Sequence, residues 1–119
     1  MKKILIVDDE ESFRKSLTSQ LKLKGYAVVE ASDGMEGVDM AARHKPDVIL
    51  SDVQMDNMNG FMMVEQMRDN PDTSMIPVIM MTGAAQGAGA WEASGDIEYL
   101  EKGFAMSKLV ETVERVLSR

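Results

Sequence analysis

Five polar residues of the kinds that handle phosphate or metal stand at the ends of short apolar runs. They are Asp8 and Asp9 after ILIV, Asp52 after VILS, Thr82 after VIMM and Lys102 after IEYLE. If these runs are parallel strands of one sheet, three carboxylates, a hydroxyl and an ammonium converge on a single edge. Open α/β sheets bind their ligands at the carboxyl edge of the strands, so we expect the functional site there.

Three carboxylates in one place predict a bound cation. Two like charges about 4 Å apart repel by roughly 4 kcal/mol at an effective dielectric constant near 20. A divalent cation removes this penalty, and carboxylate oxygens, water and a backbone carbonyl are the ligands that suit Mg²⁺. A phosphoryl group bound to that metal would still need a positive charge and a hydrogen-bond donor, which Lys102 and Thr82 can supply.

Asp52 is the best candidate for a nucleophile among the three carboxylates. It stands alone, whereas Asp8 and Asp9 form a pair suited to holding the metal. An aspartate can become an aspartyl phosphate, and an already ionised carboxylate needs no general base. Catalysis would then consist of positioning and charge stabilisation. As an isolated pair, Asp8 and Asp9 would instead suggest helix N-capping.

The elements that must position these residues alternate along the chain. Short β-like runs are separated by longer amphipathic stretches, a pattern typical of βαβ units around a parallel sheet. We predict strands over 4–7, 26–31, 47–51, 78–81 and 97–101, and helices over 12–24, 34–44, 60–69 and 104–117. Gly25 is expected to terminate the first helix. The glycine-rich segment 83–95 predicts a short or frayed fourth helix near 88–94.

Apolar residues at helical spacing predict the buried face of each helix. These faces comprise Phe13, Leu17 and Leu21; Met35, Val38 and Ala42; Phe61, Val64 and Met67; and Leu109, Val113, Val116 and Leu117.

Composition excludes several classes of protein. A length of 119 residues predicts a single domain, 1–119. No apolar run approaches the roughly 20 residues of a membrane span, and ILIV is too short for a signal peptide, so we expect a cytoplasmic protein. The chain has no cysteine, and its one histidine, His44, is expected at a helix end rather than in a metal or phosphorelay site. A net charge of −7 argues against direct binding to nucleic acid.

Taken together, the motifs KKILIVDDE, DVILSDVQM, MNG, PVIMMTG and YLEKGF resemble the receiver domain of bacterial response regulators, in particular the stand-alone, chemotaxis-regulator-like kind. The resemblance runs over nearly the whole chain. It implies a doubly wound α/β fold with five parallel strands in the flavodoxin-like order 2-1-3-4-5 and helices on both faces.

The resemblance also implies a role for each site residue. Asp52 would be the phosphoacceptor, and Asp8 and Asp9 would form the acidic pocket. Asp9, Asp52 and the backbone carbonyl of Gln54 would bind Mg²⁺. Thr82 and Tyr99 would be switch residues, and Lys102 would contact the phosphate. A sensor histidine kinase or a phosphotransfer protein would donate the phosphoryl group.

The sequence departs from the family pattern in three places. Asp56 occupies a loop position where many receivers have proline. Gly103 stands where the family usually has a cis proline, and since a non-proline cis bond costs about 3 to 4 kcal/mol, a trans or strained bond is expected. The stretch from Thr82 to Lys102 is also shorter than usual, the difference falling in the glycine-rich segment.

Four functional interpretations follow. The first is a non-enzymatic phosphorylation switch, monomeric or weakly dimeric, that signals by binding an unidentified target protein. A phosphatase resembling the haloacid dehalogenase superfamily would use similar groups, but there the second aspartate lies two positions after the first, where this chain has Glu10. A receiver that is never phosphorylated is the third. A flavodoxin-like electron carrier is disfavoured because the acidic first loop, DDEES, would not cradle a flavin phosphate.

Overall fold

Five parallel strands form one sheet in the order β2-β1-β3-β4-β5. The computed structural model describes residues 1–55, 57–83 and 97–119. The strands are β1 (Lys3–Val7), β2 (Ala27–Ala31), β3 (Val48–Asp52), β4 (Val78–Thr82) and β5 (Ile97–Glu101). The predicted fold class and strand order are confirmed, with strand boundaries that differ by a residue at most.

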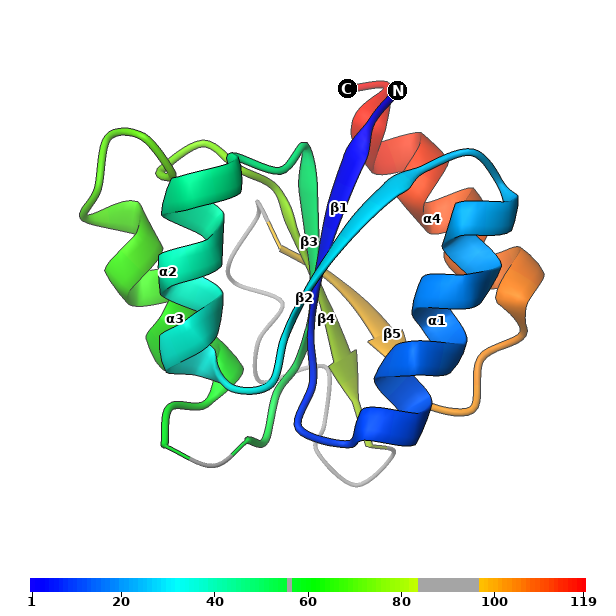
Figure 1. Cartoon of the computed structure of the whole chain (residues 1–119), viewed down its shortest axis with the longest axis horizontal. Coiled ribbons are helices and arrows are strands. Elements are labelled where there is room, and N and C mark those ends of the chain that lie inside the picture. Colours follow the sequence, from blue (N-terminus) through cyan, green and yellow to red (C-terminus); the bar gives the residue numbers. More distant parts are fainter. Residues whose placement is uncertain (56, 84–96) are drawn as a thin grey trace.

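The four helices within the described ranges cover both faces of this sheet. They are α1 (Glu11–Leu23), α2 (Gly34–His44), α3 (Gly60–Arg68) and α4 (Met106–Leu117). Helices α2 and α3 pack on one face, and α1 and α4 pack on the other (Figure 1). The additional helix predicted near 88–94 lies outside the described residues. None of the helices described is long and apolar enough to cross a membrane.

Alternate residues of each strand enter different cores. In β1, Leu5 and Val7 belong to the core under α2 and α3, whereas Ile4 and Ile6 belong to the core under α1 and α4. All four side chains are fully buried. Burial on both faces explains why the central strands read as unbroken apolar runs, as parallel strands between two helical layers do.

The buried helix faces agree with the predicted stripes except in α2. Leu17, Leu21, Val64, Met67, Leu109, Val113 and Val116 are buried as predicted. Met35, however, is 59% exposed, so its predicted inward position was wrong. The face of α2 that packs inward is made of Gly34, Gly37 and Ala41. A side chain at Gly37 would meet Met63 and Val7 within 3.2 Å, so α2 approaches its neighbours too closely for large residues there.

Helix ends fix the loops at the carboxyl edge of the sheet. Asp33 caps α2 by accepting a hydrogen bond from the Glu36 amide, and Asn59 caps α3 in the same way through the Met62 amide. The other carboxylate oxygen of Asp33 accepts a 2.8 Å hydrogen bond from the Asn57 side chain. Because Asn57 lies between Asp52 and α3, this bond ties two neighbouring loops together.

Candidate functional site

Three carboxylates meet at the carboxyl edge of the central strands. Asp8 directly follows β1, Asp9 is the next residue, and Asp52 ends the adjacent strand β3. One oxygen from each lies within 4.8 Å of the others. The parallel register pairs Val7 with Ser51, which brings the two strand ends level.

Asp8 is held rigidly inside this cluster. It is fully buried, and its Oδ1 accepts a 2.9 Å hydrogen bond from the Glu10 amide. Its own amide donates to the carbonyl of Ala31 on β2 at 3.1 Å. The residue that precedes α1 is Glu10, so neither Asp8 nor Asp9 is the N-cap of that helix. The geometry therefore gives no support to a simple capping role for the aspartate pair.

Lys102 bridges two of the carboxylates. Its Nζ lies 3.3 Å from Oδ2 of Asp8 and 3.3 Å from Oδ2 of Asp52. Burial alone would lower the pKa of Lys102, but the attraction of Asp8 and Asp52 outweighs it and the net pKa is raised. The ammonium is thus fully charged at neutral pH and partly compensates the carboxylates.

The backbone at Lys102 adopts the conformation expected without proline. The bond to Gly103 is trans, and Gly103 has φ +100°, a region that favours glycine. The Lys102 amide donates a 2.6 Å hydrogen bond to the carbonyl of Thr82 at the end of β4. The peptide between β5 and α4 is therefore tied to the neighbouring strand rather than held by a cis bond.

Ionisation of Asp52 is disfavoured in the folded protein. Burial raises its pKa, attraction to Lys102 opposes the rise, and repulsion from Asp8 adds to it. The net pKa is raised, so the ionised carboxylate destabilises the folded state relative to the unfolded chain. This penalty exists above the raised pKa and is lost as the pH falls through it and the group takes up a proton.

In metal-free buffer at neutral pH, Asp52→Asn should therefore be more stable than the wild type, because the amide carries no charge that must be buried. The difference should shrink as the pH falls towards the raised pKa. Mg²⁺ should stabilise the wild type more than the variant, since a cation that binds only the folded state stabilises by mass action. Thermal unfolding at several pH values, with chelator and with Mg²⁺, measures both effects. A variant less stable than the wild type at neutral pH would contradict the prediction.

The remaining predicted site residues differ in burial and position. Thr82 is the last residue of β4 and is only 5% exposed. Gln54 is exposed, two residues beyond Asp52. Tyr99 is half-buried in β5 and packs against the core under α2 and α3, so its side chain contributes to that face of the sheet. Asp56 lies outside the described residues.

Two neighbours of the cluster were not predicted as site residues. Arg14 donates a 2.7 Å hydrogen bond to the carbonyl of Asp8, and its Nε forms a 2.8 Å ion pair with Glu30 on β2. The ring of Phe13 lies beneath Lys102, with 4.8 Å between Nζ and the ring centroid. Their positions on α1 indicated only a helix with one apolar face, because nothing in the local sequence shows which distant loops a helix contacts.

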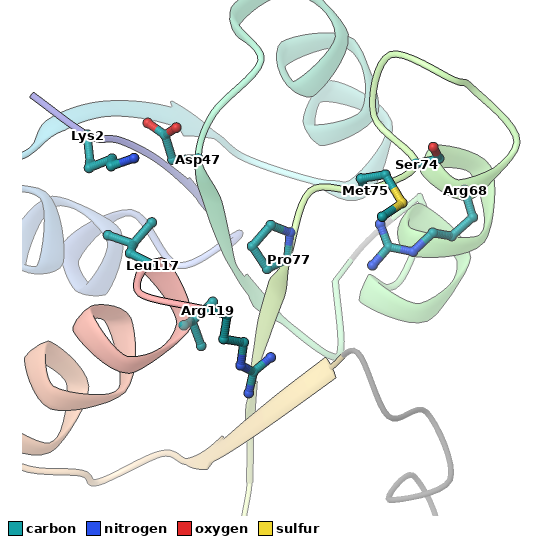
Figure 2. A pocket seen from close by; sticks show the side chains of 9 residues that line it. Lys2, Asp47, Arg68, Ser74, Met75, Pro77, Leu117 and Arg119 are labelled. Atoms are coloured by element: carbon teal, nitrogen blue, oxygen red, sulfur yellow. The ribbon is translucent and has the colours of Figure 1, made fainter.

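A cavity of about 470 Å³ lies at the opposite edge of the sheet (Figure 2). It is lined by residues that precede strands, among them Lys2, Asp47 and Pro77. Two of its charged groups are engaged by other residues: Arg119 pairs with Glu98, and Asp47 accepts a hydrogen bond from the Lys3 amide. The acidic cluster, where three carboxylates and Lys102 meet, is therefore the stronger candidate for the functional site.

Proteins of known sequence similar to this chain include several regulators. A family model described as the response regulator receiver domain matches residues 4–114. The protein PilH of Pseudomonas aeruginosa is 38% identical, and the match covers 99% of each protein. The response regulator MprA of Mycobacterium leprae is 33% identical over 98% of this chain, which spans 51% of that longer protein.

Solved structures show the same fold. The Vibrio cholerae chemotaxis protein CheY4 has a TM-score of 0.88 and 35% identity, with 98% of each chain covered. The receiver domain of a Pseudomonas aeruginosa sensor histidine kinase, crystallised with a magnesium ion coordinated in its active-site cleft, has a TM-score of 0.89 and 26% identity. That match covers 99% of this chain and 98% of the kinase domain.

Three observations favour a receiver domain over a phosphatase of the haloacid dehalogenase type. They are the sequence similarity over nearly the whole chain, the 2-1-3-4-5 sheet and the acidic cluster at its carboxyl edge. The chain belongs to the response regulator receiver domain family of two-component signalling proteins.

Proposed function

We propose that Asp52 accepts the phosphoryl group that operates this receiver as a signalling switch. The observation that carries the proposal is the bridge made by Lys102, whose ammonium contacts both the buried Asp8 and the half-buried Asp52. Asp52 is the more accessible of these two carboxylates, with 13% of its side chain exposed against none for Asp8. An incoming phosphoryl group can reach Asp52, whereas Asp8 is enclosed.

Asp8, Asp9 and Asp52, with the backbone carbonyl of Gln54, would hold Mg²⁺. The fit rests on three hard carboxylate oxygens within 4.8 Å of one another, a donor set that suits this ion. The magnesium ion in the related kinase receiver domain supports the same choice. When bound, the ion would supply positive charge that neutralises the carboxylates and the phosphoryl oxygens.

The reaction is an in-line transfer. One carboxylate oxygen of Asp52 attacks the phosphorus atom, the bond from phosphorus to the donor breaks, and its electron pair leaves with the donor. Asp52 is ionised when it attacks, so no proton must be removed first. Lys102 stabilises the charge on the transferred oxygens, and Thr82, at the end of the neighbouring strand, donates a hydrogen bond to them once they arrive.

The new charge is the signal. An aspartyl phosphate places strongly hydrogen-bonding oxygens where a single carboxylate stood, and Thr82 and Tyr99 would move in response. The donor would be a sensor histidine kinase or a phosphotransfer protein. The output would be the binding of another protein, since the net charge of −7 disfavours direct contact with nucleic acid.

Labelling with a small phosphodonor tests the proposal. The wild type, incubated with acetyl phosphate and Mg²⁺, should gain one phosphoryl group in its intact mass and none when the metal is chelated. A protein that never gains the group would be a receiver that is not phosphorylated, and the proposal would fail. Steady release of inorganic phosphate from many phosphomonoesters would instead favour a phosphatase.

A further inference from the structure

We propose that Phe13 is a positioning residue that aims the ammonium of Lys102 at the phosphorylation site. The inference rests on the role proposed above for Asp52 and Lys102 and adds a third participant. The Nζ of Lys102 lies 4.8 Å from the centroid of the Phe13 ring, within the range in which an aromatic face attracts a cation. The same nitrogen lies 3.3 Å from oxygens of Asp8 and Asp52, so the ring and the two carboxylates together surround it.

Lys102 needs such a constraint because its own backbone supplies little. A lysine side chain is long and has many rotamers, and ordering it costs entropy. The next residue is Gly103, which has no side chain, and among the residues that the structure describes a Cβ added there would meet none within 4 Å. The backbone of Lys102 is held by the hydrogen bond from its amide to the Thr82 carbonyl. This hydrogen bond fixes the Cα of Lys102 but not the ammonium at the end of its side chain.

The Phe13 ring is itself held in place. The edge-to-face contact with Phe104 has a centroid distance of 6.4 Å and an interplanar angle of 63°. The next residue, Arg14, fastens this turn of α1 to the Asp8 carbonyl and to Glu30. Phe13 therefore stands on a turn of helix that is tied to the acidic cluster itself, and it can fix the position of Lys102 relative to Asp8.

The negative charge around Lys102 explains why an aromatic residue suits position 13. A carboxylate in place of Phe13 would be a fourth acid beside a cluster that already carries three. The face of a ring attracts the ammonium without adding a formal charge, and it leaves the hydrogen-bonding capacity of Lys102 free for oxygen atoms. The ring thus holds Lys102 near Asp52 without competing for the incoming phosphoryl group.

The test compares four variants by two measurements. The variants are Phe13→Leu, Phe13→Tyr, Phe13 replaced by pentafluorophenylalanine, and Phe61→Leu as a control. The control makes the same change in a partly buried phenylalanine at the start of α3, which packs on the other core. The measurements are the NMR shift of the Lys102 ε-methylene protons, which the ring current moves upfield, and the rate of phosphoryl uptake from acetyl phosphate at saturating Mg²⁺.

Phe13→Leu should slow phosphoryl uptake about tenfold, because the ammonium is less often in place, and it removes the upfield shift together with the ring. Phe13→Tyr should retain both properties, and Phe61→Leu should change neither. Pentafluorophenylalanine keeps the shape of the ring but reverses its charge distribution, so it should also displace Lys102 and slow uptake; this variant decides the question if Phe13→Leu fails to fold.

Retention of the wild-type rate by both Phe13→Leu and the fluorinated protein would overturn the proposal, as would slower uptake by the fluorinated protein with an unchanged Lys102 shift. If the wild type took up no phosphoryl group at all, the proposed function would fail first. The Lys102 shift of the fluorinated protein, measured without phosphodonor, would then still report whether the Phe13 ring places the ammonium.

Discussion

Asp52→Asn is expected to abolish phosphoryl uptake from acetyl phosphate, to below about a hundredth of the wild-type rate, because an amide oxygen is a poor nucleophile. Asp8→Asn should still be labelled, more slowly and only at higher Mg²⁺ concentrations. Asp8 is fully buried and accepts a hydrogen bond from the Glu10 amide, so we expect it to hold charge and geometry rather than to attack. Intact-mass measurements over a time course and a range of Mg²⁺ concentrations distinguish the two variants.

The stability of the same variants supplies the control. Asp52→Asn is expected to be at least as stable as the wild type without metal, so its loss of labelling cannot come from unfolding. If Asp52→Asn retained the label and Asp8→Asn lost it, the assignment of the acceptor would be wrong. The attacking group would then stand at the end of the first strand, as in the haloacid dehalogenase superfamily.

The sheet and the acid cluster were predictable because each depends on local sequence and a general rule. Short apolar runs ended by Asp52 or Thr82 mark strands whose carboxyl ends must meet once the strands are parallel. The trans bond at Gly103 followed in the same way from the cost of a cis bond without proline. These features need no knowledge of which side chains touch across the fold.

Other features could not be predicted because they depend on the approach of distant elements. The helical periodicity predicted that Met35 is buried, but its side chain is exposed. Helix α2 packs instead through Gly34 and Gly37, where neighbouring residues lie too close to leave room for a large side chain. Phe13 was recognised only as an apolar residue of its helix, although its ring faces Lys102, which follows it by most of the length of the chain. A one-dimensional pattern gives the face of a helix but not its partner.

Gly60→Ala is expected to destabilise the protein by about 2 to 3 kcal/mol, a cost typical of overpacking. Gly60 opens α3, and a Cβ built there would lie 2.5 Å from the carbonyl oxygen of Asp52 and 3.0 Å from the sulfur of Met80. Met80 can move its flexible side chain. The Asp52 carbonyl cannot move freely, because β3 is paired with β4 at this position and the Gly60 amide itself binds the Val53 carbonyl at 2.8 Å.

Gly83→Ala is the matched control. Gly83 follows Thr82 at the same edge of the sheet, but a Cβ added there meets no described residue within 4 Å and its φ is not positive. Urea unfolding should therefore show a change within about 0.5 kcal/mol for Gly83→Ala and a clear loss for Gly60→Ala. Equal stabilities would mean that α3 does not press on the backbone of Asp52. A loss confined to Gly60→Ala, joined to slower labelling of the folded fraction, would show that the start of α3 sets the position of the acceptor carboxylate.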